Sequence, residues 1–451
     1  MVPVLVVGAC DLGSRPAGLS IPVEQHVLDN GLRVVLSQDT TTPTVVVAVY
    51  YDVGFRTEPR GRTGFAHLFE HMMFQGSANL GKNEFIELVQ SNGGVLNGST
   101  RFDYTNYFEV VPANVLETVL WAEADRMRSL DIGQENLVNQ QGVVMNEVRV
   151  NVLNQPYGGF PWLDMPQHAN SNWQNAHNFY GDLEDLEAAT LEDVRGFFDQ
   201  YYGPQNAVLV LVGDFDPPQA TRWIEQYFGD IPGGELPTKP NVTEPRQEEA
   251  KRASRTDPLA TRPALAMSWH MPPRSTPEYY AMGVVDQILA QGRDSRLYGS
   301  LVQDKGLTGG VSAGINHSLG NMLNIGGPTL YTVSLFHDAD HTAEEIIAAI
   351  DEQVELLRST PIDEETLERA KTKLRSALYS YMDSLTGFGK ADLLASFALF
   401  DGDASLINGV EAELDRVTPA LVQATAEEWL RPMNRTILEV QPAPAATEEV
   451  P

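Results

Sequence analysis

Two histidines and a glutamate in the stretch GFAHLFEHMMFQGS, from Gly64 to Ser77, have a spacing that could do chemistry. On a helix, residues three and four positions apart lie on one face, so His67, Glu70 and His71 would point the same way. Two imidazoles with a third ligand and one open coordination position make a catalytic zinc site. A nearby carboxylate can act as general base toward the zinc-bound water, whose pKa the metal lowers to about 7. The alternative is a helix whose histidines are only solvated or hydrogen-bonded in a core.

Extended, β-rich runs surround this helix in the first half of the chain. They cover Arg33–Ser37, Val45–Asp52, Tyr104–Val111 and Ala207–Val212. Strands and helices are intermixed in both halves of the sequence. The pattern therefore predicts an α+β protein with two domains, each a sheet with helices packed on it.

The two halves also resemble each other, which indicates a duplication. The first half ends LEDVRGFFDQYYGPQNAVLVLVGDFDP and the second ends PALVQATAEEWLRPMNRTILEVQP. Pro204 and Asn206 in the first half match Pro432 and Asn434 in the second. The segment between the halves is rich in Pro, Gly and charged residues, which indicates a linker. We expect a leader or disordered N-terminus over 1–20, a first domain over 21–235, a linker over 236–262, a homologous second domain over 263–441 and a disordered tail over 442–451.

The charge of the chain excludes one class of partner. Sixty-one acidic residues against 31 basic ones leave a net charge of -30 over 451 residues. A phosphate backbone would be repelled by this charge, so we expect no binding to nucleic acid.

The single cysteine, Cys10, ends the short apolar run VPVLVVGAC. This run resembles the end of a bacterial lipoprotein signal, in which the cysteine is lipidated after cleavage. The resemblance predicts a lipid anchor at Cys10 and a periplasmic or cell-envelope location in a Gram-negative bacterium. No Lys or Arg precedes the run, so a cytoplasmic protein with a buried first strand or an incorrectly assigned start is the alternative. No later stretch approaches the ~18 apolar residues of a membrane span.

The stretch TGFAHLFEHMMFQGS resembles the signature helix of the pitrilysin/insulinase family of zinc peptidases, and its mitochondrial processing peptidase-like branch most of all. The similarity runs from about Val23 to about Val440. It implies two homologous domains of the metallohydrolase fold, each a mainly antiparallel sheet with packed helices, and zinc as cofactor. The family takes its third ligand from a glutamate about 76 residues past the second histidine. That position is Glu147, in QQGVVMNEVRV.

Two further segments carry the resemblance. NGGVLNGSTRFDYTNYFEVV is similar to the family's edge strand, which pairs with the main chain of the substrate, and this implies that Asn97 and Gly98 contact substrate. Considered without the resemblance, the same residues also describe an ordinary hairpin. The family usually has a second glutamate seven residues before the third ligand. Here the position is Gln140, which keeps hydrogen-bonding capacity near the metal but lacks the charge.

The second half departs from the family at two positions. Single-chain and homodimeric members carry an Arg and a Tyr, seven residues apart, that polarise the scissile carbonyl. Here these positions are Val302 and Gly309, and neither side chain can donate to an oxyanion. Arg296 and Tyr298 lie nearby, but a structural role is the favoured interpretation for both. The resemblance therefore implies a homologous partner subunit that supplies an Arg/Tyr pair.

No second metal site is expected. When VVDQILAQG is aligned with LFEHMMFQG, the metal-site positions fall on Gly283, Asp286 and Gln287. The sequence FHDADH, from Phe336 to His341, could also bind a divalent ion through His337, Asp338, Asp340 and His341. It has, however, the character of a solvated loop that caps the helix expected to start near Thr342.

Taken together, the residues and the resemblance predict a zinc-dependent endopeptidase subunit that hydrolyses unfolded peptides or oligopeptides. His67, His71 and Glu147 would bind zinc, and Glu70 would be the general base. The alternative is a catalytically impaired subunit that holds a metal and serves for binding or as a scaffold in a two-subunit complex.

Overall fold

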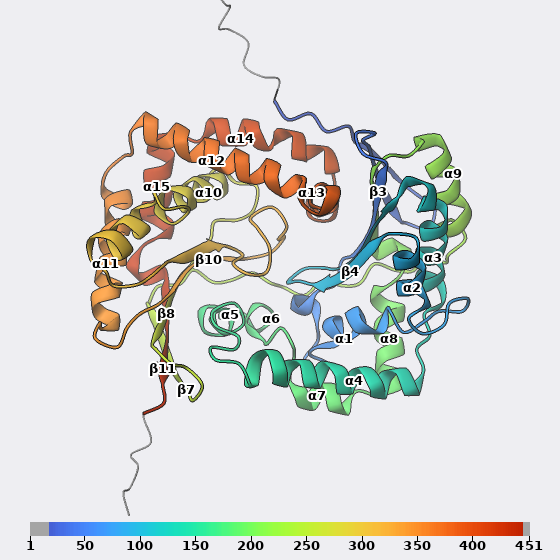
Figure 1. Ribbon diagram of the computed structural model, residues 1–451, viewed down its shortest axis with the longest axis horizontal. Helices are drawn as coiled ribbons and strands as arrows, with labels where there is room; N and C mark the ends of the chain where they lie inside the picture. Colours follow the sequence, from blue (N-terminus) through green and yellow to red (C-terminus); the bar gives the residue numbers. More distant parts are fainter. Residues whose placement is uncertain (1–17, 445–451) are drawn as a thin grey trace, which may run out of the picture.

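The computed structural model describes residues 18–444 of the chain. Cys10 and most of the predicted leader, and residues 445–451 of the predicted tail, lie outside this range. The described chain forms two β-sheets with helices around each, the first half of the sequence on one side and the second half on the other (Figure 1). This is the α+β fold with two similar domains that the sequence predicts.

The first sheet has six strands in the order β1-β2-β6-β3-β5-β4. Only β2 and β6 pair in parallel; the other neighbours are antiparallel. β3 reads TVVVAVYY and is buried on both faces, which explains its continuous apolar run. β4 lies at the edge of the sheet. The strands are β1 (Glu24–Val27), β2 (Arg33–Gln38), β3 (Thr44–Tyr51), β4 (Val95–Thr100), β5 (Thr105–Pro112) and β6 (Ala207–Gly213).

Helices of the first half cover one face of this sheet. Val45, Val47 and Val49 of β3 point into a core shared with α1, α3, α8 and α9. The α-helices are α1 (Phe65–Met72), α2 (Glu84–Ser91), α3 (Leu116–Ser129), α4 (Gln134–Val148), α5 (Asp164–Ala169), α6 (Trp173–Ala176), α7 (Leu183–Ala188), α8 (Leu191–Tyr201) and α9 (Pro217–Phe228). Shorter turns are the 3-10 helices η1 (Phe55–Thr57), η2 (Ala113–Val115) and η4 (Pro204–Asn206) and the π-helix η3 (Arg149–Leu153).

The second sheet has five strands in the order β7-β11-β8-β10-β9, again with one parallel pair, β7 and β11. β7 lies inside the segment 236–262 that the sequence predicts as a linker. From Lys251 to Thr256 its residues alternate between half-buried and exposed, as in a charged edge strand. The strands are β7 (Lys251–Asp257), β8 (Ala264–His270), β9 (Ser312–Ile315), β10 (Leu330–Phe336) and β11 (Arg435–Pro442).

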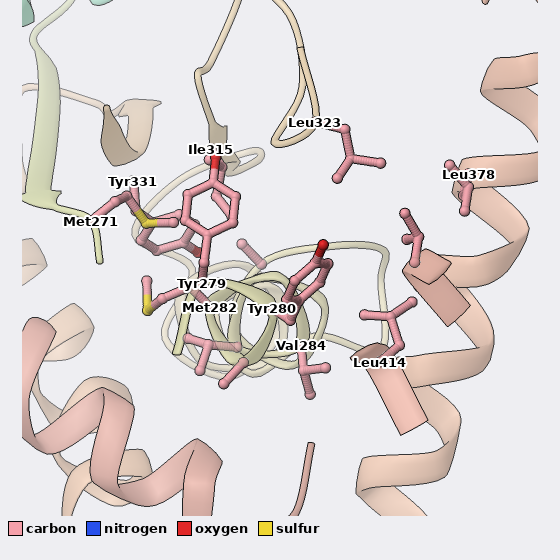
Figure 2. Packing of buried hydrophobic residues seen from close by; sticks show 14 of the residues in the cluster. Met271, Tyr279, Tyr280, Met282, Val284, Ile315, Leu323, Tyr331, Leu378 and Leu414 are labelled. Carbon is pink, nitrogen blue, oxygen red and sulfur yellow. The ribbon is translucent and has the colours of Figure 1, made fainter. Parts of the chain in front are cut away.

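Most helices of the second half pack around α10. Figure 2 shows Tyr280 of α10 on the side of Leu378 of α12 and Leu414 of α14, whereas Tyr279 and Met282 lie on the side of Met271. The α-helices are α10 (Pro277–Leu289), α11 (Ala343–Ser359), α12 (Glu364–Met382), α13 (Phe388–Phe400), α14 (Val410–Arg416) and α15 (Pro419–Trp429). The others are the π-helix η5 (Tyr298–Asp304) and the 3-10 helices η6 (Ser384–Gly387), η7 (Ala404–Gly409) and η8 (Pro432–Asn434).

The asparagines of the repeated Pro-x-Asn turns make equivalent hydrogen bonds in both halves. The Asn206 side chain donates to the carbonyl oxygens of Tyr201 at 2.9 Å and Asp52 at 3.3 Å. The Asn434 side chain donates to those of Trp429 at 2.7 Å and His270 at 3.0 Å. Each asparagine thus joins the end of a helix to the end of the neighbouring strand, as expected for a duplicated unit.

One helix of each half packs against the sheet of the other half. α13 of the second half packs against β3 and β6 on the free face of the first sheet, and the rings of Phe108 and Phe388 stack there with centroids 3.6 Å apart. α5 of the first half packs against β8 and β11, where Met165 and Ala169 meet Ala266. The two halves therefore share their cores.

Within residues 18–444, no single helix is long and apolar enough to cross a membrane. One pair of helical segments, Ser384–Phe400 and Ala404–Arg416, reaches that length and composition together, with a bend of 113° between them.

Candidate metal centre

The helix that carries the two histidines is fixed at its start by a buried glutamate. Gly64, the N-cap of α1, has a positive φ of 82° and no side chain to cap the helix. Glu58 takes over this function, since its two carboxylate oxygens accept hydrogen bonds from the backbone N–H groups of Gly64 and Ala66, both at 2.8 Å. A carboxylate at a helix N-terminus satisfies free donors and favours the helix dipole. No spacing in the sequence singled out Glu58.

Three side chains from two helices meet at one point. His67 and His71 lie one turn apart on α1, with ring centroids 4.9 Å apart. Glu147 comes from α4, which packs against α1. Nε2 of His67 lies 3.7 Å from Oε1 of Glu147, and Nε2 of His71 lies 3.2 Å from its Oε2. The structure thus brings together the three residues expected to bind the metal.

This group suits a zinc ion in its donor atoms and in its spacing. One candidate ligand atom from each of the three residues lies within 4.8 Å of the other two. Two imidazoles and one carboxylate are the protein ligands of several catalytic zinc sites. Burial lowers the pKa of His67, which favours the neutral imidazole that binds metals. The hydrogen bond with His71 lowers the pKa of Glu147 and keeps it ionised.

Glu70 lies beside this group but is held by the edge strand. Its Oε2 accepts a hydrogen bond of 2.7 Å from the hydroxyl of Thr100, the last residue of β4. Thr100 is buried, so this bond is shielded from water. A Cβ atom at Gly98 would lie 3.2 Å from Cγ of Glu70, so the backbone of β4 passes close to this carboxylate.

The residues expected to contact substrate lie on this strand. β4 pairs with β5 on one side only, which leaves its other edge unpaired within the described chain. Asn97 is exposed, and its side-chain oxygen accepts a hydrogen bond from the backbone N–H of Gly98 at 2.9 Å. An unpaired edge strand can take up an extended peptide as an additional strand.

Gln140 lies on α4, two turns before Glu147, and is buried. No hydrogen bond joins it to either histidine in the described chain. The Nδ1 atom of His67 is also buried there without a protein partner. The neighbouring Gln141 instead anchors α4, because it donates to the carbonyl oxygens of Leu186 at 2.7 Å and Ala189 at 3.1 Å.

An aromatic residue that the sequence did not indicate also reaches the site. The hydroxyl of Tyr180 lies 3.4 Å from Oε1 of Glu147, and its ring stands edge-on to His67 at 5.0 Å. Tyr180 lies in the loop between α6 and α7. Nothing in its local pattern distinguishes it from other aromatic residues of the chain.

The second half offers no comparable group within the described residues. Val302 lies in the π-helix η5, and Gly309 lies in an exposed loop. On α10, a side chain at Gly283 would meet Met322 and Leu374, and Asp286 accepts a hydrogen bond from Gln291 at 3.0 Å. Arg296 and Tyr298 belong to the same half as Val302.

The rival cluster from His337 to His341 does not assemble. Within residues 18–444, His67, His71 and Glu147 form the only group of three or more potential metal ligands. The Nδ1 atom of His337 instead lies 3.0 Å from the carbonyl oxygen of Asp338. Thr342 caps α11 through a reciprocal pair of bonds with Glu345, in agreement with the expected capping loop.

Two models of known protein families match the sequence. Residues 33–157 match "Insulinase (Peptidase family M16)". Residues 188–374 match "Peptidase M16 inactive domain". The first match contains the three candidate metal ligands, and the second contains none of them.

Similar proteins match over most of the chain or over about half of it. Zinc protease PqqE of Helicobacter pylori is 26% identical over 430 residues, which is 93% of each chain. The beta subunit of the mitochondrial-processing peptidase of Bos taurus is 24% identical over 216 residues, or 47% of this chain and 44% of that one.

Solved structures show the same fold. A protease from Helicobacter pylori superposes with a TM-score of 0.85 at 24% identity, covering 94% of this chain and all of that one. The periplasmic protease PqqL from Escherichia coli superposes with a TM-score of 0.75 at 17% identity, covering 94% of this chain and 48% of that one.

Proposed function

Since the chain belongs to the insulinase family, peptidase family M16, and is a zinc protease of that family, we propose that it is an endopeptidase subunit that hydrolyses unfolded peptides or oligopeptides. One observation carries this proposal. His67 and His71 of α1 and Glu147 of α4 converge within 4.8 Å, and a separate carboxylate, Glu70, stands on the same helix face.

The residues of the site have distinct roles in this proposal. His67, His71 and Glu147 hold the zinc ion. When bound, zinc would supply Lewis-acid activation of a water molecule and of the scissile carbonyl group. Glu70 takes the proton of the attacking water and passes it to the leaving amine. Thr100 holds Oε2 of Glu70 at 2.7 Å, which leaves Oε1 to exchange the proton.

The substrate would bind as an additional strand on β4. Main-chain pairing requires an extended peptide, so a folded protein would not serve as substrate. Asn97 and Gly98 would contact the peptide backbone next to Glu70. The close approach of Gly98 to Glu70 supports this arrangement, because a larger residue there would crowd the base. Gln140, which lies two helical turns before Glu147 on α4, would support the zinc ligands.

The site needs a partner to complete it. Negative charge develops on the scissile carbonyl oxygen during attack, and Val302 and Gly309 offer no side-chain donor to it. Loss of one such donor costs other hydrolases roughly 10²–10³ in rate. We therefore propose a heterodimer with a homologous subunit that supplies an Arg/Tyr pair. The similarity to a protein named as a peptidase subunit supports this assembly.

Mixing the subunits tests this function. We expect slow cleavage of a quenched peptide library by this chain alone, and a rise in rate on the order of 10² or more when a homologue with the Arg/Tyr pair is added. Rapid cleavage by the monomeric chain alone would contradict the heterodimer. The missing pair also favours a second candidate function, an impaired metal-holding scaffold or binding subunit. Zinc binding without cleavage in the mixture would support that alternative.

We place the protein in the periplasm or at the cell envelope of a Gram-negative bacterium, with the cytoplasm as the alternative. The apolar run before Cys10 supports export, and a structurally similar protein is named as periplasmic. Labelled palmitate should enter the full-length precursor when it is produced in a Gram-negative host. An unlabelled cytoplasmic product that keeps Met1 would exclude a lipid anchor.

A further inference from the structure

The third metal-binding residue has a neighbour that the proposed mechanism does not use. Oε1 of Glu147 lies 3.4 Å from the hydroxyl of Tyr180 and 3.7 Å from Nε2 of His67. Its other oxygen lies 3.2 Å from Nε2 of His71. We propose that Tyr180 is a positioning residue for zinc binding, whose hydroxyl donates to Glu147 and keeps its carboxylate turned toward both histidines. This inference rests on the proposed zinc site.

Glu147 needs such support because of its place in the helix. It is the second-last residue of α4, which ends at Val148 and continues as the π-helix η3 with an exposed surface. A glutamate side chain has several rotatable bonds, and this one is 27% exposed. Without a partner it would also populate orientations toward water, and each of these withdraws a ligand from the site.

Tyr180, in contrast, is fixed on several sides. Its ring contacts His67 at 5.0 Å, Phe179 at 5.0 Å and Trp162 at 5.9 Å between centroids. Its backbone packs directly against the start of α1. A Cβ at Gly64 would lie 2.4 Å from the carbonyl oxygen of Tyr180, so a larger residue has no room there. The hydroxyl is therefore held relative to the helix that carries both histidines.

The chemistry of the pair favours donation from the phenol to the carboxylate. A tyrosine hydroxyl is a donor at neutral pH, whereas an ionised carboxylate can only accept. Within residues 18–444, no side chain other than Tyr180 and the two histidines hydrogen-bonds or pairs with Glu147. Carboxylate ligands of metals are usually held by such outer partners, whose loss weakens metal binding about 10–100-fold.

Tyr180→Phe removes only the hydroxyl and keeps the ring contacts. Tyr227→Phe is a matched control, because Tyr227 also donates to a glutamate, Glu117, at 2.9 Å, but on the surface of the first half. Zinc dissociation constants would be measured for the full chain by competition with a coloured chelator, together with thermal unfolding of the metal-free proteins. We expect Tyr180→Phe to bind zinc about 10–100-fold more weakly than the wild type at an unchanged unfolding temperature, and Tyr227→Phe to bind as the wild type does.

The outcomes separate this inference from the proposed function. Equal zinc affinity of Tyr180→Phe and the wild type would overturn the positioning role, as would an equal loss in Tyr227→Phe. A wild-type chain that binds no zinc tightly would instead contradict the zinc site on which both rest.

Discussion

At the residue scale, the base and the ligands share a helix but have different supports. Glu70 follows His67 by three residues on α1, yet its carboxylate is held by Thr100 of β4 and not by the metal-binding group. Glu147 is held by the histidines and by Tyr180. Removing the base should therefore leave the ligands in place.

Glu70→Gln tests this separation. The amide keeps the shape of the side chain, but it cannot take up the proton of the attacking water. We expect the variant to retain its zinc and to lose hydrolysis by a factor of roughly 10² or more in the presence of the partner subunit. Glu87→Gln, an exposed change on the neighbouring helix α2, should alter neither property. Unchanged turnover in Glu70→Gln would remove Glu70 from the mechanism.

The residue spacing of the sequence predicts part of this site. His67, Glu70 and His71 follow from helical periodicity alone, because their contact is local. Glu147 was expected only from a family resemblance, since 76 residues separate it from His71 and no local pattern links them. Glu58 and Tyr180 depend on where two loops pass the start of α1, and a loop path is not encoded in any short-range period.

At the element scale, the exchange of α5 and α13 joins the two halves. α13 carries Asp392, which is buried between them. Its two carboxylate oxygens accept hydrogen bonds from Tyr50 of β3 and Tyr381 of α12, both at 2.7 Å, from Asn324 at 3.1 Å and from Tyr104 at 3.4 Å. Burial and the neighbouring Asp392 raise the pKa of Tyr50, so its hydroxyl remains a donor.

Asp392→Asn should loosen this junction. The amide removes the charge that strengthens these hydrogen bonds and turns an amide N–H group toward a tyrosine hydroxyl, at a cost of about 2–3 kcal/mol. We expect a lower urea midpoint for unfolding, measured by circular dichroism. Asp383→Asn, an exposed change at the end of α12, should leave the midpoint unaltered. An unchanged midpoint in Asp392→Asn would mean that this network adds nothing to stability.

The sequence predicts most strands of the first sheet, but not which helices pack on it. The strands predicted at Arg33–Ser37 and Val45–Asp52 correspond to β2 and β3 within one residue at each end. Periodicity identifies such strands because one or both faces are apolar. It does not say which helix covers a face, and α13 begins at Phe388, far along the chain from Gly213, where the last strand of that sheet ends. The polar strand β7 gave no apolar signal at all.

At the scale of the whole molecule, the two halves share an architecture but differ in their functional residues. The turns at Asn206 and Asn434 are the same, and both sheets contain one parallel pair. Only the first half carries the metal-binding group within the described chain. In the second half, the space at Gly283 is filled by Met322 and Leu374. The second half therefore contributes packing against the first. In our proposal, the missing donors come from a partner subunit.

The zinc content of purified protein tests the central claim most directly. Metal analysis should find about one zinc per wild-type chain, and the ion should be removed by a chelator. His71→Ala takes away one of the three ligands and should lose this zinc. His341→Ala, which removes a histidine from the rival cluster, should keep it. A full equivalent of zinc in His71→Ala, or its loss in His341→Ala, would contradict the assignment of the metal centre to His67, His71 and Glu147.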